Sequence, residues 1–73
     1  MNYEGMIVKW DGMWWYVYRQ IEGVMYVSYW YENAEWGKED DNMYEDVELV
    51  EDYVDTSHLT SKKALQIAWT LER

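Results

Sequence analysis

Two X-Gly dipeptides, Asp11-Gly12 and Glu22-Gly23, constrain the fold of this chain more than any other feature of its sequence. They separate three runs of β-branched and aromatic residues within residues 5–32, and such residues favour strands. Asp-Gly is a strong signal for a two-residue hairpin turn, because glycine accepts the positive φ that a type I′ turn requires. Glu-Gly carries a weaker form of the same signal. The sequence therefore predicts a three-stranded antiparallel meander.

Two-residue turns also fix which residues pair across the strands. The first turn predicts the pairs Trp10–Met13, Val8–Trp15 and Met6–Val17. The second turn predicts the pairs Ile21–Val24, Val17–Ser28 and Trp15–Trp30.

Alternation of side chains then divides the three strands between two faces. One face carries Met6, Val8, Trp10, Met13, Trp15, Val17, Arg19, Ile21, Val24, Tyr26, Ser28 and Trp30. The other carries Ile7, Lys9, Trp14, Tyr16, Tyr18, Gln20, Met25, Val27, Tyr29 and Tyr31. Neither face is polar, so each must be covered or must serve as a binding surface. We expect the first face, which is richer in aliphatic groups, to form the core, and the second to be a platform of Tyr and Trp rings.

The rest of the chain predicts a long loop, an edge strand and a helix. Residues 33–44 predict the loop, and loops of this length are often functional. The acidic stretch 46–55 predicts a fourth strand at a sheet edge, where charge discourages unwanted pairing. Residues 56–73 show apolar residues at helical spacing after three candidate N-caps, which predicts a helix near 58–72. The candidate caps are Thr56, Ser57 and Thr60.

These elements predict one α+β domain over residues 1–73. Its expected form is an antiparallel β-meander of three to four strands with one C-terminal helix, and the alternative is an SH3-like barrel with an added helix. The chain contains no cysteine, so folding must rest on packing and not on disulfides or a thiolate metal site. Its aromatic residues are six Trp and eight Tyr with no Phe. Such rings carry a polar group and suit half-buried positions and interfaces.

The charge is concentrated in one band. The formal net charge is −9, while residues 32–55 hold eleven acidic residues against Lys38, a net of −10. A chain of this charge is repelled by a bare phosphate backbone and attracted to basic surfaces. No signal-peptide pattern and no apolar run of membrane-spanning length is present, which predicts a cytoplasmic protein that neither inserts in a membrane nor binds nucleic acid directly.

The residue types needed for catalysis or metal binding are poorly arranged. His58 is the one histidine, and its neighbours Ser57 and Ser61 lie at an expected helix start, where a capping or solvated role is typical. A calcium-loop pattern begins at Asp40, but it needs Asp or Asn where Tyr44 stands and Gly where Glu45 stands. We therefore predict no enzyme activity, no metal and no cofactor.

The acidic band and the aromatic face together favour a protein–protein interface, in which rings anchor the partner and charge steers its approach. If residues 46–55 form a strand, Asp46 and Glu48 lie about 6.6 Å apart on one face, which is of the order of successive phosphates on a nucleic-acid strand. An array of this kind could occupy a basic groove. The alternative interpretation of the band is that it only keeps an aromatic protein soluble.

In its small size, its lack of cysteine and its stretch EDDNMYEDVELVED (39–52), the chain resembles small acidic phage-encoded inhibitors of host defence, such as anti-CRISPR proteins and DNA mimics. The resemblance implies a non-catalytic protein that occludes a nucleic-acid-binding surface of a defence complex in the bacterial host cytoplasm. The alternative is an SH3-like interaction module that binds a peptide or a subunit through its Tyr/Trp face.

The predicted partner-binding residues fall into two sets. The carboxylates that would engage Lys and Arg are Glu39, Asp40, Asp41, Glu45, Asp46 and Glu48. The exposed rings that would anchor the partner are Trp14, Tyr16, Tyr29, Tyr31 and Trp36.

Overall fold

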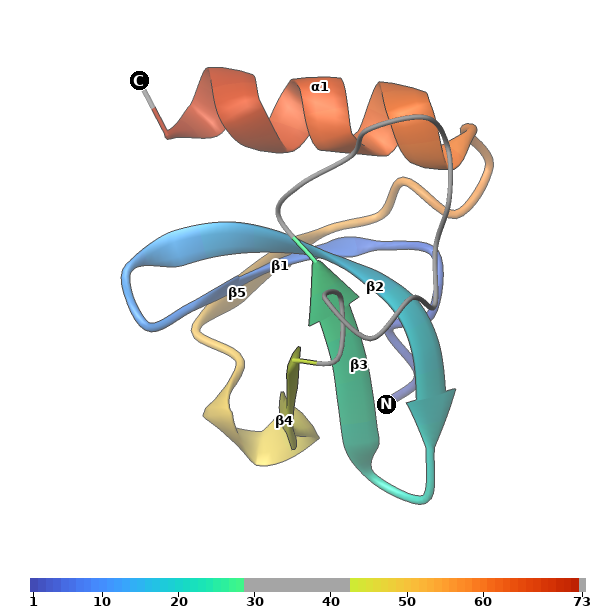
Figure 1. Ribbon diagram of the computed structural model, residues 1–73, viewed down its shortest axis with the longest axis vertical. Helices are drawn as coiled ribbons and strands as arrows, with labels where there is room; N and C mark the ends of the chain where they lie inside the picture. Colours follow the sequence, from blue (N-terminus) through green and yellow to red (C-terminus); the bar gives the residue numbers. More distant parts are fainter. Residues whose placement is uncertain (29–42, 73) are drawn as a thin grey trace.

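The computed structural model describes residues 1–28 and 43–72, which form a five-stranded antiparallel sheet and one C-terminal helix (Figure 1). The elements are β1 (Ile7–Trp10), β2 (Met13–Ile21), β3 (Val24–Ser28), β4 (Met43–Asp46), β5 (Asp52–Val54) and α1 (Ser61–Leu71). The strand order is β4-β3-β2-β1-β5. The predicted α+β fold is confirmed, with one strand more than expected. Within the described ranges β4 and β5 are the sheet's two edges and do not pair with each other, so the sheet is not closed into a barrel.

Both hairpin turns form as the sequence predicts. All four turn residues have positive φ, with 53° at Asp11, 75° at Gly12, 48° at Glu22 and 82° at Gly23. Positive φ at both central positions is the mark of a type I′ turn, whose twist matches that of the flanking strands. The three predicted pairs beside the turns are confirmed, namely Trp10–Met13, Val8–Trp15 and Ile21–Val24.

The register between β2 and β3 slips by one residue at Tyr18. Arg19 lies opposite Tyr26, as predicted, but Val17 lies opposite Val27, so the predicted pair of Val17 with Ser28 is wrong. Tyr18 is the extra residue of a β-bulge, and a bulge reverses which side chains of the bulged strand face the core. The predicted pair of Trp15 with Trp30 lies outside the described residues.

The bulge corrects the predicted face assignment on β3 and on β2 beyond Tyr18, where Arg19 and Ile21 lie on the face opposite the core and Gln20 lies on the core face. Val8, Trp15 and Val17 are buried in the core, as predicted. They are joined there by Met25 and Val27, which the unbulged register places on the platform face. Val24 and Tyr26, which that register assigns to the core, are turned to the opposite face.

The second face of the sheet is partly covered by α1. Ala64 and Ala68 of the helix pack against Ile7 and Trp14, with the half-buried ring of Tyr16 beside them. Figure 1 shows α1 crossing one end of the molecule above β1 and β2. The helix begins after Thr60, whose hydroxyl accepts the N–H of Lys63 at 3.2 Å. Such a bond satisfies one of the N–H groups that a helix start leaves without a partner, so the prediction of Thr60 as an N-cap is confirmed.

Residues 46–55 do not form the single strand that the sequence predicts. β4 ends at Asp46, residues Val47–Leu49 form one turn of 3-10 helix, and β5 begins at Asp52 on the opposite edge of the sheet. Half-buried Val47 and Val50 pack against the core and interrupt the strand. The five residues between β4 and β5 carry the chain from one edge of the sheet to the other. The predicted loop 33–44 also ends early, because β4 already begins at Met43.

Candidate interaction surface

Three tyrosines line up across β2, β3 and β4 on the face that the bulge turns outward. The ring centroids of Tyr18 and Tyr26 are 6.4 Å apart, and those of Tyr26 and Tyr44 are 5.9 Å apart. Tyr26 and Tyr44 are direct cross-strand partners. Both ring pairs are tilted, an arrangement that aromatic pairs prefer over face-to-face stacking. We call Tyr18, Tyr26 and Tyr44 the tyrosine ladder.

The outer end of the tyrosine ladder is open to solvent. Tyr44 is 64% exposed, while Tyr18 and Tyr26 are half-buried. The next row on the same face consists of Ile21, Val24 and Asp46, as the register of the three strands requires. Ile21 is 42% exposed. The tyrosine ladder is therefore bordered by the apolar side chains of Ile21 and Val24 on β2 and β3, and by the carboxylate of Asp46 on β4.

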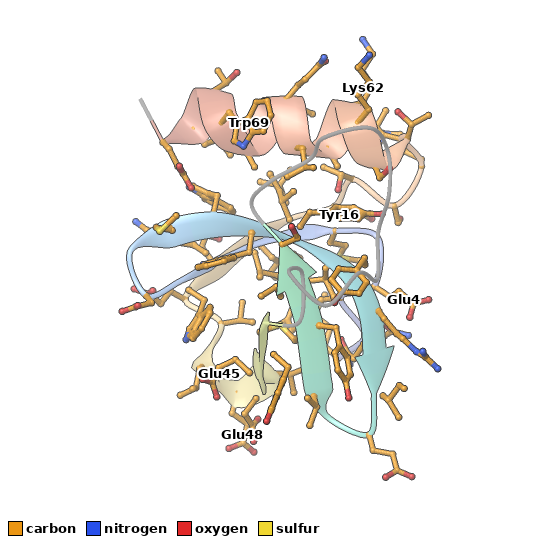
Figure 2. All side chains as sticks on the ribbon, in the orientation of Figure 1. Glu4, Tyr16, Glu45, Glu48, Lys62 and Trp69 are labelled. Atoms are coloured by element: carbon orange, nitrogen blue, oxygen red, sulfur yellow. The ribbon has the colours of Figure 1, made fainter. Side chains whose placement is uncertain are left out.

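Three predicted carboxylates gather where β4 meets the following turn, and we call Glu45, Asp46 and Glu48 the acidic corner. Figure 2 places Glu45 and Glu48 at the end of the molecule opposite α1. Asp46 lies on the same face of β4 as Tyr44, two residues along the strand. Glu45 alternates to the other face and is half-buried, while Asp46 and Glu48 are exposed.

The predicted strand spacing of Asp46 and Glu48 is wrong. Asp46 is the N-cap of the 3-10 turn, and its Oδ1 accepts the N–H of Glu48 at 2.9 Å. The two residues are therefore held in a tight local cap and not displayed along an extended strand. Within the described residues none of the three carboxylates forms an ion pair, and Asp46 and Glu48 carry the exposed charge of the acidic corner.

Several carboxylates of the acidic band also accept hydrogen bonds from the backbone. Glu45 Oε1 accepts the N–H of Asp46 at 3.1 Å on β4, and Asp52 Oδ1 accepts the N–H of Tyr53 at 2.8 Å on β5. Both strands are sheet edges, where an unpaired N–H can recruit a strand from another molecule. The acidic residues thus have a local role at the sheet edges in addition to the charge they present.

Two of the predicted anchor rings are not exposed. Trp14 is 9% exposed beneath α1, and Tyr16 is half-buried beside it. The reason is that the helix covers the half of the platform face to which these rings belong. Burial raises the pKa of Tyr16, and the nearby Glu4 carboxylate raises it further. Figure 2 shows Tyr16 between the sheet and the helix.

The remaining predicted site residues lie outside the described ranges. They are Tyr29, Tyr31, Trp36, Glu39, Asp40 and Asp41.

None of the three members of the tyrosine ladder is among the rings predicted from the sequence as anchors. The unbulged register placed Tyr26 in the core, and Tyr44 was assigned to a loop. Tyr18 was placed on the platform face but was not selected. One signal was available, since tyrosine recurs within each of the three segments that became β2, β3 and β4.

Asp55 and Ser57, just before His58, form a local hydrogen-bonded turn ahead of α1. Asp55 Oδ1 accepts the hydroxyl of Ser57 at 2.6 Å and its N–H at 3.0 Å. These bonds hold the pKa of the Asp55 carboxyl below its usual value, and His58 contributes a smaller electrostatic part. His58 itself is exposed. Among the described residues no group of three His, Cys, Asp or Glu side chains is placed to hold a metal ion.

The one helix in the described part of the chain is too short to cross a membrane. Comparison of the chain with family models, curated proteins and solved structures finds no match.

Proposed function

We propose that this chain is a non-catalytic binding protein that occludes a basic surface of a target protein, a surface that normally holds nucleic acid. The observation that carries the proposal is the meeting of an exposed ring with an exposed carboxylate at one corner of the sheet, where Tyr44 and Asp46 share a face of β4. Interfaces are commonly anchored by tyrosine, and a carboxylate beside the ring selects a cation.

The charge of the whole chain supports the same partner. With a net charge of −9 the protein is attracted over long range to basic surfaces, which raises the rate of encounter. The same charge disfavours direct binding to DNA or RNA. Proteins that bind nucleic acid expose the basic surfaces that fit these requirements.

The specific form of the proposal is a phage-encoded inhibitor of a bacterial defence complex, of the anti-CRISPR or DNA-mimic type, acting in the host cytoplasm. Its support is compositional, namely 73 residues, no cysteine and a concentrated acidic band. The tyrosine ladder favours a second candidate, an interaction module that binds a peptide or a subunit of a larger assembly. The two candidates differ in whether nucleic acid competes for the partner.

Competitive capture from a bacterial lysate tests the proposal. The immobilised parent protein should retain nucleic-acid-binding proteins, and an excess of a mixed-sequence oligonucleotide should release them. The triple variant Glu45→Gln, Asp46→Asn, Glu48→Gln should retain much less, because it removes three charges while keeping the oxygens that accept backbone N–H groups.

A matched triple variant serves as the control. Glu4→Gln, Asp11→Asn and Glu72→Gln removes the same charge from residues outside the acidic band and also keeps the acceptor oxygens. It should capture like the parent. If the two triple variants capture equally, or if the oligonucleotide releases nothing, the proposed function is wrong. Release by a peptide and not by the oligonucleotide would favour the interaction module.

A further inference from the structure

We infer that the tyrosine ladder binds an arginine side chain carried by an extended segment of the partner. The guanidinium stacks on the ring of Tyr44 and pairs with the carboxylate of Asp46. The inference rests on the proposed function and names the group that the surface recognises. It concerns a ring-based contact, which is distinct from the long-range attraction of the acidic band.

The spacing of the rings fits an extended segment. Neighbouring centroids in the ladder are 5.9 and 6.4 Å apart. In an extended chain, side chains two residues apart are about 6.4–6.8 Å apart on one face. A segment lying across β4, β3 and β2 can therefore place alternate side chains over Tyr44, Tyr26 and Tyr18 in succession.

Charge along the ladder sets where a cation can lie. Asp46 follows Tyr44 on the same face of β4, and Glu48 is linked to it by a 2.9 Å hydrogen bond. At the other end exposed Arg19 lies directly opposite Tyr26 on β2. An incoming cation is attracted to the β4 end and repelled from the β2 end, so the arginine belongs over Tyr44.

The geometry favours arginine over lysine. A guanidinium is planar, is weakly hydrated and stacks on aromatic faces while its N–H groups remain available in the ring plane. Asp46 uses Oδ1 for the N–H of Glu48, and within the described residues its Oδ2 accepts no hydrogen bond. One guanidinium can stack on the ring of Tyr44 and donate to Oδ2 at once. A lysine ammonium is not planar, so it can contact the ring face or donate to Oδ2 but cannot do both with good geometry.

Part of this arginine-binding site is already ordered before a partner binds. Tyr44 is fixed at its backbone by pairing with Tyr26, and its ring rests 5.9 Å from the ring of Tyr26. Asp46 is held by its role as an N-cap. A surface that is ordered in advance loses less conformational entropy on binding.

Binding of an end-capped serine hexapeptide that contains one central arginine tests the inference, with affinity measured by NMR titration. The parent should bind it more tightly than the same peptide with lysine in place of the arginine. Tyr44→Leu should weaken binding of the arginine peptide about two- to fivefold, the scale of an exposed cation–π contact. Tyr44→Phe keeps the ring face and should bind within about twofold of the parent. Arg19→Gln should strengthen binding, because it removes the repelling charge.

The outcomes separate this inference from the proposed function. If Tyr44→Leu binds both peptides as the parent does, the tyrosine ladder is not the arginine-binding site and the inference is wrong, whatever the lysate experiment gives. Equal affinity for the arginine and lysine peptides overturns it as well. If the ring effects appear while the acidic-corner variant still captures its targets, the ladder recognises arginine and the proposed function fails. Tyr44 is exposed on an edge strand, so its variants test binding with little risk to folding.

Discussion

The sheet face that carries Trp14, Tyr16 and the tyrosine ladder has two halves with similar chemistry, which differ most in exposure between Trp14 at 9% and Tyr44 at 64%. Trp14 and Tyr16 lie under α1 in the first half, and Tyr26 and Tyr44 stand beyond it in the second. Both pairs are aromatic residues with a polar group, and both belong to the same face of one sheet. Their difference comes from the helix, which packs on β1 and β2. Aromatic composition therefore predicts that a half-buried surface exists, while the position of the covering element decides which part of it can meet a partner.

The largest expected effect comes from removing a ring from each half. Trp14→Ala should lower the free energy of unfolding by about 3–5 kcal/mol, because it leaves a cavity between the helix and the sheet. Tyr44→Ala should change it by about 1 kcal/mol or less, since the ring is largely in solvent already. Urea unfolding of the two variants measures the contrast. Equal losses would show that the two halves do not differ as the structure indicates.

A smaller effect is expected at the contact that joins the helix end to the covered half. Glu72 Oε1 accepts the backbone N–H of Trp14 at 2.8 Å. Glu72→Ala removes that acceptor and should cost about 1 kcal/mol of unfolding free energy. Glu72→Gln keeps an acceptor oxygen and should cost less. If the alanine and glutamine variants are equally stable in urea, this bond does not hold the helix on β2.

Alkaline pH should lower the free energy of unfolding because Tyr16, in the half of the face under α1, loses its phenol proton. Its pKa is raised in the folded protein, first by burial and then by Glu4, so the folded state binds the phenol proton more tightly than the unfolded state does. The stability linked to this group is complete below the ordinary pKa of 10.0 and is lost as pH rises through the folded value. Tyr16→Phe should remove this part of the alkaline loss.

The measurement is the midpoint of urea unfolding from pH 8 to pH 11 for the parent and for Tyr16→Phe. Tyr44→Phe provides the matched control, because it removes a phenol from the exposed half. Identical pH dependence in the parent and in Tyr16→Phe would contradict the assignment.

The smallest expected effect is at Asp55, before the helix. Hydrogen bonds from Ser57 lower its pKa in the folded protein below the usual value of 3.8. Its contribution to stability is therefore present above that value and is lost as pH falls through the lower folded value. Asp55→Asn should show a weaker acid dependence of unfolding than the parent, in a comparison of thermal midpoints from pH 5 to pH 2. An unchanged acid dependence would show that Asp55 does not contribute to stability in this way.

The parts of the fold set by local chemistry were predictable. The X-Gly turns and the threonine N-cap gave the hairpins, the pairs beside the turns and the helix, because each depends on a few neighbouring residues. The bulge at Tyr18 was not predictable, since it depends on how β2 packs on two layers at once. The break in residues 46–55 was also missed, because Val47 and Val50 leave the strand to cover a core formed by distant residues.

Whether the predicted residues bind a partner stays a prediction, but the structure shows where some of them lie. Glu45 and Asp46 lie at the end of β4, and Glu48 lies in the 3-10 turn that follows it. Of the predicted rings that the structure describes, Trp14 is buried and Tyr16 is half-buried under α1, since nothing in the sequence states where the helix will lie. One slipped register was enough to move Tyr26 from the predicted core to the half-buried middle of the tyrosine ladder.

The most direct test of the account is an NMR map of the serine hexapeptide with one central arginine on the parent protein. Ring resonances of Tyr44 and Tyr26 should shift progressively as the peptide is added, and those of Trp14 and Tyr16 should stay in place. The shifts should shrink as salt is raised from low to physiological concentration, because the pairing with Asp46 is exposed to solvent. Shifts centred on Trp14 and Tyr16, or no shift of the Tyr44 ring at saturating peptide, would contradict the account.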